Sequence, residues 1–159
     1  MLGNTGDYER VEDLPNLRLT SVDETHGADS LSRHKSFVSI NSALSIDLTG
    51  QATSETVDGK TISASGGLTD FHRAALATED GRAILALKAT TKKGQSTIVD
   101  RHPAGTRISI GATEIDYVVT EFGIADLRFR DARARAAALA RIAAPQYRTD
   151  LERSSQLQG

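Results

Sequence analysis

The apolar run Ala83-Ile84-Leu85-Ala86-Leu87 limits the fold of this chain more than any other feature of its sequence. Five residues without a polar side chain, preceded by the turn residues Glu79-Asp80-Gly81, are typical of a strand that is buried on both faces. Strands of this kind occur in sheets that other elements cover. The run therefore predicts the buried strand of an α/β fold.

Further strands and helices follow from the remaining patterns. Alternating or continuous apolar residues predict strands over residues 37–40, 44–48, 98–99, 107–110 and 115–119. Short helices are expected over Asp70–Thr78 and over the alanine-rich segment Asp131–Ala143, which ends before Pro145. One more turn is expected over Gln146–Leu151. These elements predict a mixed sheet with short helices packed on it.

Two adjacent glycines, Gly66 and Gly67, stand directly before the first of these helices. The first turn of a helix has no internal partners for its N–H groups, which leaves the amides of Gly67 and Leu68 free. Glycine also permits φ > 0 and lets a ligand approach the main chain. The stretch therefore predicts a nest for a phosphate, another anion or a developing oxyanion. A plain strand-to-helix turn is the simpler interpretation of the same spacing.

Three segments carry a resemblance that extends from about Leu19 to Leu151. They read Asn41-Ser42-Ala43-Leu44 followed by Asp47-Leu48-Thr49-Gly50-Gln51, then Gly66-Gly67-x-x-Asp70-Phe71-x-Arg73, and finally Val118-Val119-Thr120-Glu121-Phe122-Gly123-Ile124-Ala125. In this order they resemble signatures of the acetyl-CoA hydrolase/transferase family. The resemblance implies an α/β fold like the C-terminal half of a class I CoA-transferase.

In that family a glutamate attacks an acyl-CoA and becomes a glutamyl-CoA thioester, which a second carboxylate or water resolves. The resemblance places this glutamate upstream of the present chain. It implies the CoA-binding, oxyanion-binding half of an acyl-CoA hydrolase or CoA-transferase of acetate metabolism, inactive by itself. The alternative is a non-catalytic CoA-binding or partner subunit that pairs with a separate glutamate-bearing chain.

The resemblance also assigns site residues and partners. The amide of Gly67 would be the oxyanion donor, and CoA would contact Ser63, Gly66, Gly67 and Lys92. Lys93 is the alternative to Lys92, because one residue is missing between Gln95 and Ser96, and a solvated lysine pair is the simpler interpretation. Coenzyme A or acyl-CoA enters as substrate, beside a short carboxylate, with no permanently bound cofactor. The missing N-terminal half or subunit is the expected partner, and a homo-oligomer is expected.

Composition excludes several other classes of function. A net charge of −2 and a pI of about 6.1 give no basic footprint for nucleic acid. The absence of cysteine excludes disulfides and thiolate sites. No apolar run approaches the roughly 20 residues that span a bilayer, and residues 1–4 lack the pattern of a signal peptide, so a cytoplasmic protein is expected.

The other polar residues suggest structural roles. His26 and His34 are expected to be solvated loop residues, and His72 and His102 lack paired ligands, so no metal site is assigned. Glu121 is interpreted as a structural acceptor at a strand-to-helix turn. The expected organisation is a lead-in segment over residues 1–35, a domain over 36–151 and a polar tail over 152–159.

Overall fold

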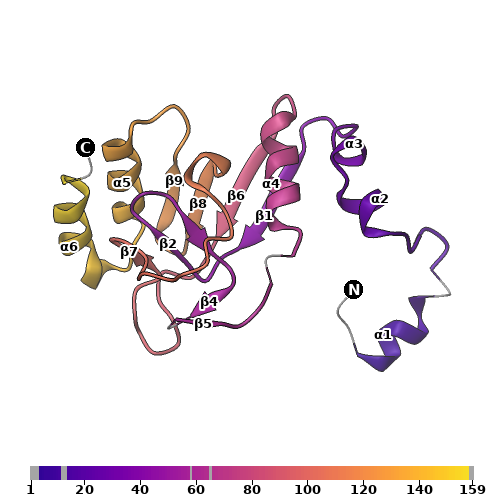
Figure 1. The fold of residues 1–159 in the computed structure, drawn as a ribbon, viewed down its shortest axis with the longest axis horizontal. Coiled ribbons are helices and arrows are strands. Elements are labelled where there is room, and N and C mark those ends of the chain that lie inside the picture. Colours follow the sequence, from indigo (N-terminus) through magenta and orange to yellow (C-terminus); the bar gives the residue numbers. More distant parts are fainter. Residues whose placement is uncertain (1–3, 12–13, 58, 65, 158–159) are drawn as a thin grey trace.

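The computed structural model describes residues 4–11, 14–57, 59–64 and 66–157. Its helices are α1 (Thr5–Glu9), α2 (Val22–His26), α3 (Ala28–Leu31), α4 (Leu68–Ala77), the short 3₁₀ helix η2 (Ala112–Glu114), α5 (Ala132–Arg141) and α6 (Pro145–Ser155). Its strands are β1 (Val38–Ser42), β2 (Ser45–Asp47), β3 (Ala52–Thr53), β4 (Thr56–Val57), β5 (Lys60–Thr61), β6 (Arg82–Ala86), β7 (Ile98–Val99), β8 (Tyr117–Thr120) and β9 (Gly123–Asp126). Figure 1 shows their arrangement.

The main sheet has four strands in the order β1-β6-β8-β9. Strands β1, β6 and β8 are parallel, and β9 folds back antiparallel on β8. The apolar run of the sequence forms the interior strand β6, in which Ala83 and Leu85 are fully buried. The predicted α/β fold is therefore confirmed, with a mixed sheet built around that strand.

A smaller sheet, in the order β3-β2-β7, packs beside the main one, and β4 and β5 form a separate hairpin. The strand expected over residues 107–110 is wrong. Only Ile110 pairs there, in an isolated bridge with Ala52, and the 3₁₀ helix η2 follows directly after it. The sequence pattern misled because Ile110 is buried by the core and not by a sheet partner.

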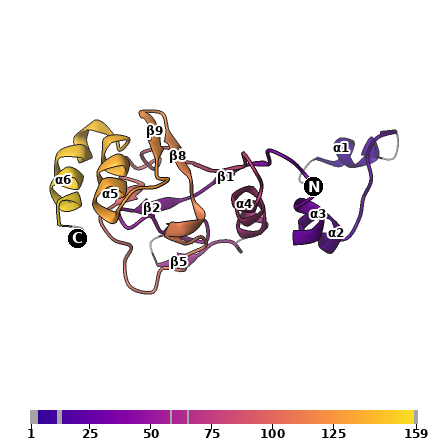
Figure 2. The ribbon, with the colours of Figure 1, turned by 90° about the horizontal axis from the view of Figure 1, so that it is seen from above.

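Helices α4 and α5 cover one face of the main sheet. Helix α4 packs against β1 and β6, α5 packs against β9, and α6 packs on α5. Figure 2 shows α4 on one side of the sheet, with no described helix on the opposite side of β1 and β8. Asp131 caps α5 by accepting from the N–H of Ala134 at 2.7 Å, and Pro145 opens α6, so both helices begin with residues suited to those positions.

The hydrophobic core lies between these helices and the two sheets. Its fully buried members include Ile46 of β2, Leu85 of β6, Ile98 of β7, Val118 of β8 and Leu139 of α5. In α4, Leu68, His72 and Ala75 lie on one helical face and are buried against the sheet. The core therefore fixes the start of α4, and with it the position of the two glycines.

The lead-in segment projects from this body (Figure 1) and contacts it through aromatic rings. His26 meets Phe71 of α4 edge-on with ring centroids 4.7 Å apart, Phe71 stacks on Phe37 at 6.1 Å, and His34 lies 5.9 Å from Phe37. The expectation that His26 is merely a solvated loop residue is therefore wrong, because its ring packs on α4. The division of the chain at residues 35 and 151 stays a prediction.

His72 makes stability depend on pH. Burial lowers the pKa of its imidazole below the ordinary value of 6.5, although the Glu114 carbonyl and the Asp116 carboxylate oppose that effect. Below pH 6.5, His72 therefore binds a proton more readily in the unfolded chain than in the folded chain. Its contribution to the free energy of unfolding is complete above this pH and is lost as the pH falls. The slope contributed by His72 is at most about 1.4 kcal/mol per pH unit.

We expect His72→Gln to flatten this part of the profile, measured by urea unfolding between about pH 5 and about pH 8. His34→Gln is the matched control, because His34 is exposed. A wild-type decline that survives in His72→Gln would assign the pH dependence to other groups.

Candidate active site

The two glycines build the turn that starts α4. Gly66 has φ +58°, the left-handed region that favours glycine, and a Cβ there would meet nothing within 4 Å. Gly67 is the N-cap residue of α4 and receives no side-chain cap. Among the described residues, nothing accepts a hydrogen bond from the N–H of Gly67 or of Leu68. Within the described residues, these two N–H groups therefore have no acceptor, and they lie at the positive end of a ten-residue helix.

Gly67 also has a close neighbour that the sequence did not indicate. A Cβ at this position would lie 2.5 Å from Cδ2 and 2.6 Å from Nε2 of His26, and 3.0 Å from Cε2 of Phe71. A larger residue here would therefore require the His26 ring to move. The contact joins residues 41 positions apart, which is why a local pattern could not reveal it.

A network of hydroxyl groups ties Ser63 to the first turn of α4. The Ser63 hydroxyl donates to the carbonyl of Ser54 at 2.8 Å, and the N–H of Ser54 donates to the Ser109 hydroxyl at 2.9 Å. The hydroxyl of Thr69 in α4 donates to the Ser109 carbonyl at 3.1 Å. The structure therefore brings Ser63 close to the glycine turn. Ser65 lies outside the described residues.

Lys92 lies elsewhere, in the exposed loop between β6 and β7. Thr91 closes this loop by donating from its N–H to the Gln95 carbonyl at 2.8 Å and accepting from the N–H of Gly94 at 2.9 Å. Tyr147 of α6 donates its hydroxyl to the Gly94 carbonyl at 2.7 Å. The backbone that carries Lys92 and Lys93 is therefore held in place, while both side chains extend into solvent.

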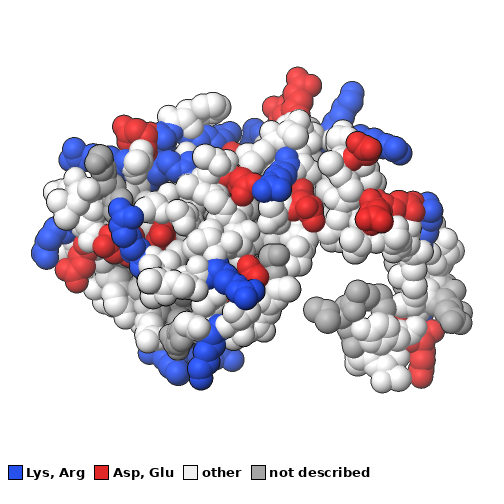
Figure 3. Space-filling view, in the orientation of Figure 1, with Lys and Arg blue, Asp and Glu red and all other residues white. Residues whose placement is uncertain are grey.

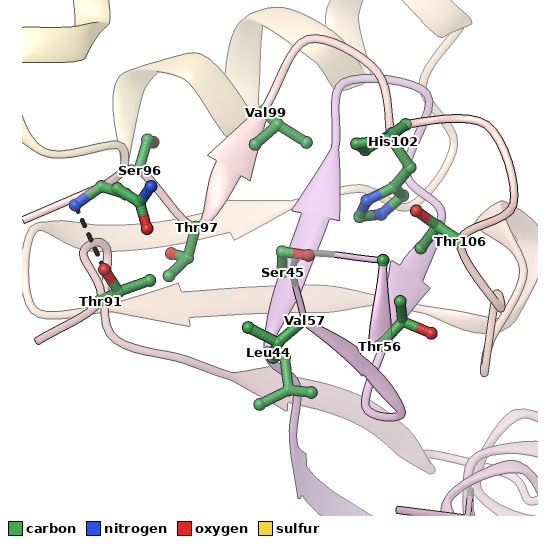
Figure 4. Close-up of a pocket in the computed structure, with 13 residues that line it drawn as sticks. Leu44, Ser45, Thr56, Val57, Thr91, Ser96, Thr97, Val99, His102 and Thr106 are labelled. Atoms are coloured by element: carbon green, nitrogen blue, oxygen red, sulfur yellow. Dashed lines mark hydrogen bonds between the residues drawn. The ribbon is translucent and has the colours of Figure 1, made fainter. Parts of the chain in front are cut away.

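A cleft of about 490 Å³ opens beside this loop. Figure 4 shows its walls, with Ser45 from β2, Thr56 from β4, Thr91 and Thr97 from the loop and its end, and the imidazole of His102. None of the four predicted site residues lines it. Several labelled residues carry hydroxyl groups, but those of Ser96 and Thr97 already donate to the carbonyls of Ile98 and Lys88, and the exposed lining of the cleft is mainly apolar. No local sequence pattern indicated the cleft, because its walls come from segments that meet only in the fold.

Asp47 explains one of the sequence signatures structurally. Its carboxylate is almost fully buried and accepts from the N–H and hydroxyl of Thr49 and from the N–H of Gln51, at 2.5–3.1 Å. The other oxygen accepts from the N–H of His102 at 3.4 Å, and the His102 ring contacts the Gln51 carbonyl. This segment therefore shapes the β2–β3 turn and one wall of the cleft.

Glu121 is an acceptor, as predicted, but at a different kind of turn. It lies in the hairpin between β8 and β9, so the expected strand-to-helix turn is wrong. Its carboxylate accepts from the N–H of Ala89 at 2.9 Å, and this hydrogen bond lowers the pKa of Glu121. The contact anchors the start of the loop that carries Lys92.

Other ionisable groups near α4 form a structural pair. Arg73 donates from Nε to Glu114 at 2.6 Å, and Glu114 also accepts from the N–H of Gly111 at 3.1 Å. Burial alone would raise the pKa of Glu114, but these hydrogen bonds outweigh it and the pKa is lowered. Across residues 4–11, 14–57, 59–64 and 66–157, no three His, Cys, Asp or Glu side chains gather closely enough to hold a metal ion. No helix in those ranges has the length and apolar character of a membrane span.

Solved structures share this architecture. The crystal structure of RipA from Yersinia pestis matches with a TM-score of 0.87 and 34% identity, over 98% of this chain and 35% of that chain. A 4-hydroxybutyrate CoA-transferase from Porphyromonas gingivalis matches with a TM-score of 0.78 and 35% identity, over 99% of this chain and 36% of that one. The fold is therefore that of the C-terminal part of these longer proteins.

Sequence comparison leads to the same family. The 4-hydroxybutyrate coenzyme A transferase of Clostridium kluyveri is 38% identical over 152 residues, which are 95% of this chain and 35% of the relative. The chain thus spans about a third of the length of the relatives it matches. The profile of the acetyl-CoA hydrolase/transferase C-terminal domain matches residues 3–155. This chain belongs to the acetyl-CoA hydrolase/transferase C-terminal domain family.

Proposed function

We propose that this chain is the part of a CoA-transferase or acyl-CoA hydrolase that binds coenzyme A and supplies the oxyanion donor. The observation that carries the proposal is the pair of amides, from Gly67 and Leu68, at the start of α4, which have no acceptor in the part of the chain that the structure describes. The nucleophilic glutamate would come from another part of the enzyme. The substrates would be an acyl-CoA and a short carboxylate, the class of molecules that the names of the relatives describe.

These two amides suit the chemistry of acyl transfer. Attack of a carboxylate on a thioester carbonyl moves the carbonyl electrons onto oxygen, and the negative oxygen needs a donor that is already in place. When the tetrahedral species collapses, the CoA thiolate leaves and the carbonyl re-forms. A preorganised backbone donor is worth about 3 kcal/mol of barrier at such an oxygen. The Gly67 N–H would be that donor, and the Ser63 hydroxyl would lie beside the thiol arm.

Charge on the surface supports a phosphate-bearing ligand. In Figure 3, Lys and Arg gather along the lower edge of the molecule, where β4, β5 and the loop after β6 lie in Figure 1. Lys60 of β5 and the loop residues Lys92 and Lys93 are exposed. Coenzyme A carries several phosphate charges, and Lys is a common point-charge partner of phosphate. The basic edge therefore fits the nucleotide end of the coenzyme.

We expect Lys92→Ala to weaken CoA binding by about 1.5–3 kcal/mol, the value of a hydrogen bond to a charged group, or about 10- to 150-fold in Kd. Calorimetric titration of CoA into the isolated chain measures this change. Because the lysine is exposed, the loss should shrink as salt is added.

Lys93→Ala and Lys60→Ala are the matched controls, since each removes one exposed positive charge from the same edge. Weakening confined to Lys93→Ala would shift the contact by one residue. Equal and negligible effects of all three substitutions would remove this edge from the CoA site.

A further inference from the structure

The two faces of the main sheet differ sharply in how they are covered. Residues that point toward α4 and α5, including Ala83, Leu85, Val118 and Ala125, are buried. The intervening residues point the other way, and three of them are exposed, with Val38 at 51%, Ile40 at 67% and Ile124 at 68%. Figure 2 shows no described helix over this side of the sheet. We call it the outer face; its larger apolar members are Val38, Ile40, Ile84, Tyr117, Val119 and Ile124, and Arg82, Ser42, Ala86 and Asp126 lie on the same side of the strands.

Strand register makes the outer face one continuous patch. Ile40 pairs with Ile84, and Ile84 with Tyr117, across β1, β6 and β8. Two residues beyond Tyr117 in β8, Val119 pairs with Ile124 of β9. Charged groups lie at its margin, where Arg128 bonds to Asp126 and stacks over the Tyr117 ring at 4.5 Å. The patch therefore has an apolar centre and a polar rim.

A bare apolar face is unusual on a parallel sheet. Sheets with parallel strands are covered on both faces, because their strands are apolar on both sides. Contiguous exposed apolar patches with polar rims mark surfaces that bind another protein. The exposed β-branched side chains of β1 and β9 thus require a partner that is itself apolar.

We propose that the outer face is the docking surface for the part of the enzyme that carries the nucleophilic glutamate. The inference rests on the proposed function. It commits to this occupant because the relatives share the fold of this chain over only 35% of their length. In those longer proteins, the rest of the polypeptide is available to cover this face.

The absence of cysteine from this chain permits a direct test. The portion of the Clostridium kluyveri 4-hydroxybutyrate coenzyme A transferase that lies outside the matched region would be co-expressed with this chain. Single variants Ile40→Cys and Ile124→Cys place a thiol on the outer face. Ile62→Cys is the matched control, because Ile62 is 59% exposed but belongs to the segment after β5. Maleimide labelling of this chain is followed by mass spectrometry.

We expect the two parts to co-purify, and labelling at positions 40 and 124 to slow at least tenfold in the complex while position 62 reacts as before. Ile40→Asp with Ile124→Asp should abolish co-purification, whereas Ile62→Asp should not. Near-ultraviolet circular dichroism of each variant checks its folding. The cysteine variants keep the test valid if the double Asp variant unfolds.

Three results would overturn the docking surface. In the first, position 40 reacts in the complex as fast as in the isolated chain. In the second, this chain forms a homodimer that the added portion does not displace. In the third, the two parts do not associate at all. CoA titration of the isolated chain separates this inference from the proposed function. Normal CoA binding without association defeats only the docking surface, and association without CoA binding or acyl exchange defeats only the proposed function.

Discussion

No acyl exchange between acetyl-CoA and labelled acetate is expected from this chain by itself. The proposed mechanism requires a glutamate that becomes a thioester, and the family resemblance predicts that this residue is none of the eight glutamates of this chain. Three described ones are committed to structural contacts, Glu55 with Ser109, Glu114 with Arg73, and Glu121 with Ala89. A carboxylate held in such bonds is a poor nucleophile. Incorporation of label from acetate into acetyl-CoA measures the exchange.

The matched positive control is the whole Clostridium kluyveri relative under the same conditions. Borohydride reduction after incubation with acetyl-CoA adds a second measurement, since it traps a glutamyl thioester. A trapped thioester on any glutamate of this chain would place the nucleophile here and contradict the expected division of labour. Exchange by the co-expressed pair, with none by either part, is the result that supports it.

Turnover in such a reassembled enzyme is expected to fall about 10²- to 10³-fold when Gly67 loses its N–H, the cost of removing one oxyanion donor. Gly67→Pro removes that donor, and the φ of −85° at Gly67 lies near the range that proline adopts. The substitution also introduces a Cβ that collides with His26. Steric damage must therefore be separated from loss of the hydrogen bond.

A pair of double variants achieves that separation. His26→Ala removes the colliding ring, so His26→Ala/Gly67→Ala and His26→Ala/Gly67→Pro both accept the new Cβ more readily, and only the second lacks the N–H. The proline variant should be slower by the full factor in kcat. Equal turnover of the two folded variants would reduce Gly66 and Gly67 to a plain turn.

Local patterns were sufficient to predict the elements that organise the fold. The apolar run Ala83–Leu87 became β6, and the helices expected at Asp70–Thr78 and Asp131–Ala143 became α4 and α5. Helix α4 starts at Leu68, two residues earlier than expected, because Leu68 is buried against the sheet. The pattern of apolar residues predicts these elements because each one buries one face or is fully enclosed, so its apolar side chains lie where it is buried.

Elements whose form depends on distant partners were not predictable in the same way. Strand β9 begins with glycine and is only four residues long, and it is a strand because it folds back on β8 and pairs with it. Segment 107–110 has an alternating pattern, but it meets a strand at one position only, where Ile110 bridges Ala52 of β3. The covering of Gly67 by His26, and the walls of the cleft around Ser45 and His102, arise from chain segments that meet only after folding.

The hydrogen bond from Tyr147 to the Gly94 carbonyl connects α6 to the loop that carries Lys92. It lets a helix near the C-terminal end of the chain set the order of a loop more than 50 residues earlier. A loop that is already ordered loses less conformational entropy when it captures a ligand. If Lys92 binds phosphate, substitutions in α6 would retune affinity without touching the ligand. Related proteins with identical loops would then differ in coenzyme affinity according to whether α6 makes this hydrogen bond to the loop.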